Sequence, residues 1–154
     1  MTEAKKFPIQ YFELSDIEII HSIISEKFKG VGEPIPSFEL AKKDKLDALI
    51  NAPKRSFFGI DAYPTIYHKA AIIFYLINKD QIFANGNKRM STACLIIFLA
   101  INGKDLNIDP DELTSKALEI SQTEAGNFQQ IKVELVKWIH ENTKDKQEEN
   151  ENTM

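Results

Sequence analysis

The sequence predicts an all-α fold of about six or seven helices with one short β-hairpin or loop that projects as a flap. Apolar residues recur at helical spacing through most of the chain, glycine and proline residues separate these segments, and one segment is apolar on nearly every side. The length of 154 residues fits one domain. We expect a domain over residues 1–142 and a disordered acidic tail over residues 143–154.

The first half of the chain predicts two helices. Ser15 and Glu18 have the spacing of a capping box. The apolar residues after this pair lie on one helical face: Ile19, Ile20, Ile23, Ile24 and Phe28. The glycines and proline of residues 30–34 end this helix, and a second helix is expected to begin near Ser37 and to end at Pro53.

The segment of residues 54–63 differs in composition from the predicted helices: it lies between two prolines and is rich in aromatic side chains. It is too short for a helix, which favours a loop or a short β-hairpin. Phe57 and Phe58, which precede Gly59, either pack on the body of the protein or stay exposed and capture a partner chain by strand addition.

The second half of the chain predicts further helices. Residues 65–78 return to helical spacing, and residues 89–101 are the most apolar part of the chain, which is typical of a central buried helix. Cys94 is expected to be a small core residue of this helix. Asp109, followed by proline, is a strong helix start, and a last helix is expected from about Asn127.

Composition excludes several classes of function. The chain has 19 Lys and Arg against 23 Asp and Glu, a net charge of −4, whereas nucleic-acid-binding surfaces are normally basic. One cysteine forms neither an internal disulfide nor a Cys-based zinc site. The chain lacks an apolar run long enough to span a membrane, and its first residues lack the apolar stretch of a signal peptide. We therefore expect a cytoplasmic protein that binds neither nucleic acid nor membranes.

One loop has residues suited to binding an anion. The segment Gln81–Arg89, QIFANGNKR, leads into the N-terminus of the most apolar helix, where free backbone N–H groups and the helix dipole favour an anion. Lys88 and Arg89 add two positive charges, and Arg89 can make two parallel hydrogen bonds to phosphate oxygens. Phe83 is expected to anchor the loop in the core. These features predict a phosphate site, and an ordinary helix–helix loop with a solvated basic pair is the alternative.

The loop resembles the signature of the Fic/Doc superfamily, H-x-F-x-[D/N/E]-[G/A]-N-[G/K]-R. The chain keeps Phe83, Gly86, Asn87, Lys88 and Arg89 in register with this signature. The Asn-Lys-Arg ending is typical of the Doc, or "death on curing", toxins. The resemblance extends over about residues 12–140, and the flap lies where the family has a segment that positions the target.

The resemblance implies an enzyme that binds ATP and Mg²⁺ at this loop. Gly86 would let the backbone approach the nucleotide, and Asn87 and Arg89, with Lys88 beside them, would contact its phosphates. Most Fic enzymes transfer AMP to a protein hydroxyl, whereas the lysine of Doc-type members favours transfer of the terminal phosphoryl group.

The resemblance also implies two protein partners. The implied target is a translation factor, such as the bacterial elongation factor that delivers aminoacyl-tRNA. Many Fic proteins carry an inhibitory motif, [S/T]-x-x-x-E-[G/N], and this sequence does not contain it. The implied restraint is therefore a separate antitoxin.

The chain departs from the family pattern at position 81, and at position 85 it has the amide where the pattern also allows an acid; both positions affect the chemistry. Gln81 replaces the histidine that acts as general base, and a glutamine amide has no usable pKa and only forms hydrogen bonds. Asn85 replaces the acidic residue that helps to hold Mg²⁺; its amide oxygen can ligate a hard cation, but it lacks the negative charge. Because a general base contributes about 10²–10⁴-fold in rate, we expect impaired activity.

Three explanations of Gln81 stay open at this point. The chain is a natural member with degenerate chemistry, a variant made inactive, or a protein in which Asp80 or His68 supplies the base. Two functions follow: a transferase toxin, native or inactivated, or a non-catalytic pseudoenzyme that binds nucleotide or an antitoxin. An unrelated helical domain with a coincidental loop is a third interpretation.

Overall fold

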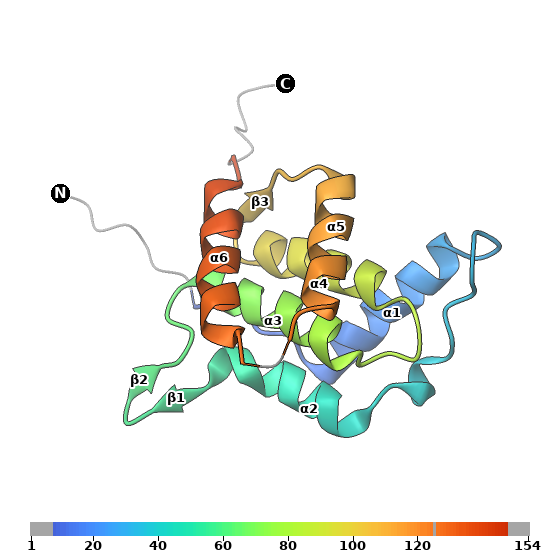
Figure 1. Cartoon of the computed structure of the whole chain (residues 1–154), viewed down its shortest axis with the longest axis horizontal. Coiled ribbons are helices and arrows are strands. Elements are labelled where there is room, and N and C mark those ends of the chain that lie inside the picture. Colours follow the sequence, from blue (N-terminus) through green and yellow to red (C-terminus); the bar gives the residue numbers. More distant parts are fainter. Residues whose placement is uncertain (1–7, 125, 148–154) are drawn as a thin grey trace.

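The computed structural model describes residues 8–124 and 126–147. Within these residues it contains six α-helices, which confirms the predicted all-α fold (Figure 1). The helices are α1 (Leu14–Lys27), α2 (Lys43–Asn51), α3 (Ile66–Asp80), α4 (Asn87–Ile101), α5 (Pro110–Ser121) and α6 (Phe128–Glu141). Two short 3₁₀ turns flank α2: η1 (Phe38–Leu40) and η2 (Ala52–Lys54). No helix of the described residues is long and apolar enough to cross a membrane.

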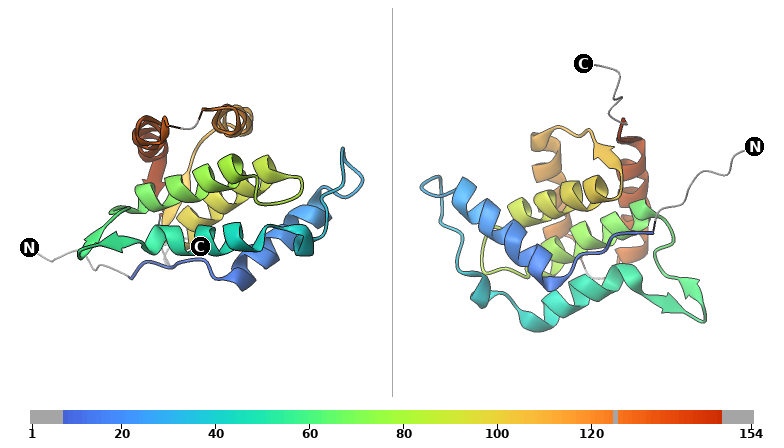
Figure 2. Two further views of the ribbon diagram at one scale, coloured as in Figure 1. Left: turned by 60° about the horizontal axis from the view of Figure 1, so that its bottom comes forward. Right: turned by 180° about the vertical axis from the view of Figure 1, so that it is seen from behind.

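The helices form three layers, with α3 and α4 in the middle (Figure 2). Helices α5 and α6 pack on one face of this pair, and α1 and α2 pack on the other. The central helices supply the most buried apolar side chains, among them Phe74, Ile77, Leu95 and Phe98. Cys94 of α4 is buried among them as predicted, and burial raises the pKa of its thiol to about 12.

Helix α1 begins differently from the prediction. The expected capping box of Ser15 and Glu18 is wrong, because Glu13 occupies the N-cap position and Asp16 is its partner. The Glu13 backbone N–H donates to Asp16 Oδ2 at 2.8 Å. Because serine is a more usual cap residue than glutamate, the sequence pattern predicted the N-cap at Ser15, two residues after the actual N-cap.

The second predicted helix is in fact two elements. Ser37 caps the short η1 turn, and α2 begins only at Lys43, because Ala41 and Lys42 have extended backbone. Lys42 contacts the end of α3 and the residues that follow it. Its backbone N–H donates to the Ile82 carbonyl at 2.9 Å, and its Nζ donates to the Asp80 carbonyl at 3.1 Å. The connection between η1 and α2 thus supports the loop that precedes α4.

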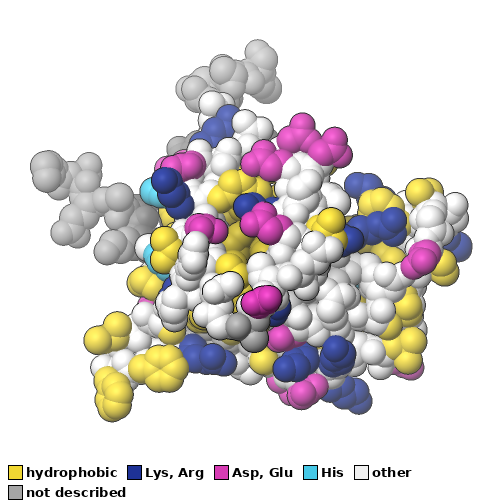
Figure 3. Space-filling model, viewed as in Figure 1, with side chains coloured by type: hydrophobic (Ala, Val, Ile, Leu, Met, Phe, Trp, Pro, Cys, Tyr) yellow, Lys and Arg dark blue, Asp and Glu magenta, His cyan; other side chains and the backbone are white. Residues whose placement is uncertain are grey.

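The predicted flap is a β-hairpin of β1 (Ser56–Phe57) and β2 (Ile60–Asp61). Phe58 and Gly59 form its turn with φ values of 52° and 79°, as a two-residue hairpin turn requires. The packing alternative for the aromatic pair is wrong, since Phe57 is largely exposed and Phe58 fully exposed. Figure 3 shows apolar side chains gathered at this projecting hairpin.

A second small sheet corrects the prediction for the tail. Strand β4 (Thr143–Asp145) pairs antiparallel with β3 (Lys104–Leu106), and Lys104 forms an ion pair with Asp145. The prediction of disorder from residue 143 is therefore wrong for these residues, because the backbone of β3 provides hydrogen-bond partners that composition does not reveal. Residues 148–154 of the predicted tail lie outside the described residues.

Candidate functional site

The loop between α3 and α4 has two residues in the left-handed backbone region. Gln81 follows the last residue of α3 with φ 47°, and Gly86 precedes α4 with φ 79°. A Cβ atom at Gly86 would also lie 3.2 Å from the Ile35 side chain. Glycine at position 86 therefore suits both the left-handed backbone and the close approach of the Ile35 side chain.

Gly86→Ala is expected to lower the free energy of unfolding by more than the same change at Gly103. Both glycines have φ 79°, so both substitutions carry the left-handed penalty of about 1–2 kcal/mol. Only the new Cβ at position 86 meets another atom within 4 Å. Urea denaturation of the two variants measures the difference, and equal losses would contradict a packing role for Gly86.

Phe83 anchors the loop in the core, as predicted. It is 3% exposed, and its ring centroid lies 5.5 Å from that of His21 and 6.2 Å from that of Phe38. The neighbouring Ile82 is completely buried, and its carbonyl accepts the hydrogen bond from Lys42. The middle of the loop is thus held by apolar packing on one side and a backbone hydrogen bond on the other.

Asn87 braces the loop from within. Its Oδ1 accepts the Phe83 N–H at 2.9 Å, and its Nδ2 donates to the Phe83 carbonyl at 2.9 Å. The same Nδ2 lies 3.3 Å from Gln81 Oε1. Both ends of the Asn87 amide therefore form hydrogen bonds inside the loop, and Asn87 positions the loop backbone. A contact of Asn87 with a phosphate stays a prediction.

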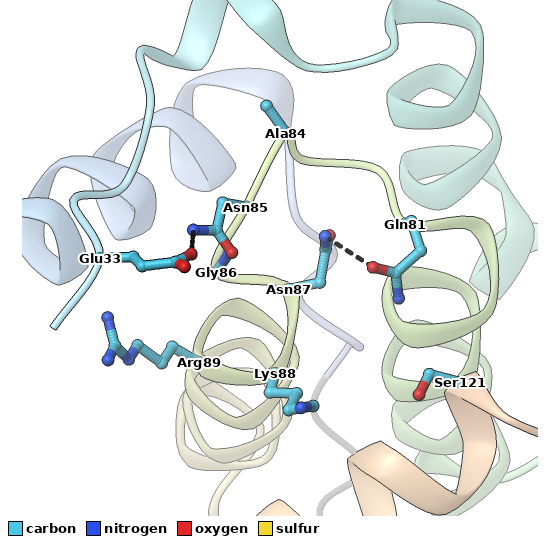
Figure 4. Close-up of a pocket in the computed structure, with 9 residues that line it drawn as sticks. All are labelled: Glu33, Gln81, Ala84, Asn85, Gly86, Asn87, Lys88, Arg89 and Ser121. Carbon is cyan, nitrogen blue, oxygen red and sulfur yellow. Dashed lines mark hydrogen bonds between the residues drawn. The ribbon is translucent and has the colours of Figure 1, made fainter.

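Gln81 is held in the same network. Its Nε2 donates to the Asn78 carbonyl at 2.6 Å, while its Oε1 accepts the hydrogen bond from Asn87 (Figure 4). A neutral amide has no usable pKa and cannot take a proton from an incoming hydroxyl, and these hydrogen bonds give the side chain a structural role instead. Position 81 therefore contributes to loop geometry, and it supplies no general base.

The loop faces a cavity of about 610 Å³ (Figure 4). The residues that line it are Glu33, Gln81, Ala84, Asn85, Gly86, Asn87, Lys88, Arg89 and Ser121. Six of the predicted site residues are thus brought together, whereas the hairpin residues Phe57, Phe58 and Gly59 and the buried Phe83 do not line the cavity.

The two cations of the loop differ in how they are held. Lys88 is exposed, and Arg89 Cζ lies 4.2 Å from the centroid of the Phe28 ring. Among the described residues neither cation forms an ion pair with a carboxylate. Stacking on Phe28 orders the guanidinium without neutralising it. Both charges therefore remain available to an anion at the N-terminus of α4.

Sequence reasoning missed two residues of the cavity wall. Glu33 comes from the segment after α1, and its Oε2 accepts a hydrogen bond from Asn85 Nδ2 at 2.9 Å. Ser121 is the last residue of α5, and its hydroxyl donates to the Leu118 carbonyl. Neither lies near the loop in sequence, so only the packing of the helices brings them to it.

The two alternative bases do not line the cavity. His68 lies in the first turn of α3, at the opposite end of that helix from Gln81, and its Nδ1 is 2.6 Å from Thr65 Oγ1. Burial lowers the pKa of His68. Asp80 ends α3, and its carbonyl accepts the Lys42 hydrogen bond. The arrangement therefore gives no support to either residue as a substitute for the motif histidine.

The fold and the cavity define a helical protein with a loop cavity, lined by two cations, at the N-terminus of its central helix. Comparison with known proteins agrees with this class: a family model described as "Fic/DOC family" matches residues 11–99. The chain belongs to the Fic/Doc family, which confirms the resemblance inferred from the loop and rules out an unrelated helical domain.

One curated relative matches part of the chain. It is Toxin Doc of Mycolicibacterium smegmatis, with 38% identity over 66 residues, which are 43% of this chain and 51% of the relative. The chain thus spans about half the length of that relative. No solved structure matches the chain.

Proposed function

We propose that this chain is a Doc-type toxin that binds ATP with Mg²⁺ in the loop cavity. The observation that carries the proposal is the pair Lys88 and Arg89, which lack ion pairs among the described residues and line a cavity at a helix N-terminus. The similarity to a protein named Toxin Doc supports the toxin class. Arg89 would hold phosphate oxygens through its two parallel N–H groups, and Lys88 would add a mobile point charge.

The proposed reaction moves a phosphoryl group, or AMP, from ATP to a Ser or Thr hydroxyl of a protein. In phosphoryl transfer the target oxygen bonds to the terminal phosphorus, the bond to the ADP oxygen breaks and ADP leaves, and the hydroxyl proton passes to a general base or, without one, to water. Gln81 cannot act as the base for that proton because a neutral amide has no usable pKa. We therefore expect an impaired transferase. We propose a translation factor as the target protein. We propose a separate antitoxin as the inhibitor of the toxin.

The hairpin is suited to binding the target protein of this reaction. Phe57 and Phe58 are exposed, and the two-residue strands leave backbone groups for an added chain. Its base is held by Lys69, a buried residue whose Nζ donates to the Pro53 carbonyl at 2.8 Å. A firm base with an exposed apolar tip favours capture of an extended segment of the target.

A non-catalytic pseudoenzyme that binds nucleotide or an antitoxin is the second candidate. The network of Gln81 favours it, since that residue hydrogen-bonds to Asn87 and to the Asn78 carbonyl, a structural role that needs no catalysis. The two candidates share the nucleotide site and differ only in turnover.

Calorimetric titration with ATP and Mg²⁺ tests the shared part of both candidates. Arg89→Ala is expected to weaken ATP binding about 10–100-fold, the effect of losing hydrogen bonds to a charged group. Arg55→Ala is the matched control, because Arg55 is exposed and lies outside the cavity. Unchanged ATP affinity in Arg89→Ala, or equal losses in both variants, would contradict a phosphate site at this loop.

A further inference from the structure

The segment after α1 contributes Glu33 to the cavity wall, on the side opposite Gln81 (Figure 4). It contacts two residues of the motif. Phe28 lies against the Arg89 guanidinium at 4.2 Å, and Glu33 accepts a hydrogen bond from Asn85 at 2.9 Å. A Cβ at Gly32 would lie 3.5 Å from Arg89 Nη2, so the backbone of this segment also passes close to the arginine. The segment is therefore part of the site.

Among the described residues that line the cavity, Glu33 is the only carboxylate. It forms no ion pair among the described residues, and Asn85 uses only its Oε2. A carboxylate beside two phosphate-binding cations would by itself weaken the binding of an anion. Its position becomes favourable when a cation lies between it and the phosphates.

The donor set fits Mg²⁺ held jointly with a nucleotide. Magnesium takes oxygen ligands, and proteins bind it through one or two carboxylates together with phosphate oxygens. The described residues contain no group of three or more His, Cys, Asp or Glu side chains that could hold a metal ion alone. One carboxylate, Glu33, and one amide side chain, Asn85, lie next to each other at the phosphate-binding helix end.

We propose that Glu33 supplies the negative charge for this Mg²⁺ that Asn85 lacks at the motif position. The inference rests on the proposed binding of ATP in the cavity. The Asn85 amide donates a hydrogen bond to Glu33 and so holds the Glu33 carboxylate beside the motif position. An acidic residue at position 85 would place its own charge there. The charge comes from a segment 52 residues earlier in the chain, and the motif taken alone therefore understates the affinity of the site for a divalent cation.

The test measures ATP binding by calorimetry, once in EDTA and once with saturating Mg²⁺, for the original chain and Glu33→Gln. The glutamine carbonyl can still accept the Asn85 hydrogen bond, so the loop is expected to keep its conformation. In EDTA the variant is expected to bind ATP as tightly as the original or more tightly, since a repulsive charge is gone. With Mg²⁺ it is expected to bind about 10–100-fold more weakly, as after loss of a residue that supports a metal.

Two further variants sharpen the result. Glu39→Gln removes an exposed carboxylate outside the cavity and is expected to change neither measurement. Glu33→Gln combined with Asn85→Asp returns the charge to the motif position and is expected to regain the Mg²⁺ effect. Paramagnetic resonance of Mn²⁺ added with ATP gives a second readout, in which Glu33→Gln lowers the fraction of protein-bound metal.

The outcomes separate this inference from the proposed function. Tighter ATP binding by Glu33→Gln both with and without Mg²⁺ would overturn the inference, because the carboxylate would then act only by repulsion. An unchanged Mg²⁺ effect would overturn it as well. In either case ATP binding itself would remain. If the original chain binds no ATP under either condition, the proposed function fails and this inference fails with it.

Discussion

Gln81→His is expected to raise protein labelling from ATP by about 10²–10⁴-fold, the usual contribution of a general base. Histidine tolerates the left-handed region that residue 81 occupies at φ 47°, so the change needs no movement of the backbone. Purified protein of both forms, incubated with a cell extract and either γ- or α-labelled ATP, measures the effect. Label from the γ position indicates phosphoryl transfer, and label from the α position indicates AMP transfer.

Gln81→Ala and a double variant, Gln81→His with Arg89→Ala, are the controls. The alanine form lacks a base and is expected to stay inactive, and the double variant is expected to lose the label because its phosphate site is incomplete. Absence of label in Gln81→His, with ATP binding retained, would contradict a lost base as the sole defect. That result would favour the pseudoenzyme.

Phe83→Ala is expected to lower the free energy of unfolding by about 3–5 kcal/mol, the usual cost of removing a buried phenylalanine. Its ring is 3% exposed and packs against the rings of His21 and Phe38. Removing it leaves a cavity directly beneath the loop. ATP affinity is expected to fall as well, because the loop loses its apolar anchor.

Phe58→Ala is the matched control for Phe83→Ala. It makes the same chemical change at a fully exposed side chain and is expected to alter stability by no more than about 0.5 kcal/mol. Denaturant titration followed by circular dichroism measures both variants. A loss at Phe83 as small as that at Phe58 would show that the loop is held by its hydrogen bonds alone.

Local patterns in the sequence predict much of this fold. Helix α4 is apolar nearly all round, so its central position follows from composition. Asp109 and Pro110 mark the start of α5, where the Asp109 carboxylate accepts the Asp111 N–H at 2.8 Å. The hairpin follows from a short aromatic segment between prolines. In each case the decisive residues are neighbours in the chain.

Features that depend on distant residues could not be predicted in this way. Glu33 and Ser121 reach the cavity only because α1 and α5 pack against α4. The strand at Thr143–Asp145 exists because β3 lies beside it. The roles of Gln81 and Asn87 as mutual braces also depend on the turn of the loop, which brings their amides to 3.3 Å.

The pairing of β3 with β4 has a mechanical consequence for the cavity. Helices α5 and α6 lie between these strands in the chain, so the sheet fastens one end of their layer, while the opposite end of α5 carries Ser121 into the cavity wall. Beyond that end, Lys79 Nζ donates to the Thr123 carbonyl. The layer is thus fastened near both ends, by the β3–β4 sheet at one and by the Lys79 hydrogen bond beyond Ser121 at the other, in addition to its packing on α3 and α4.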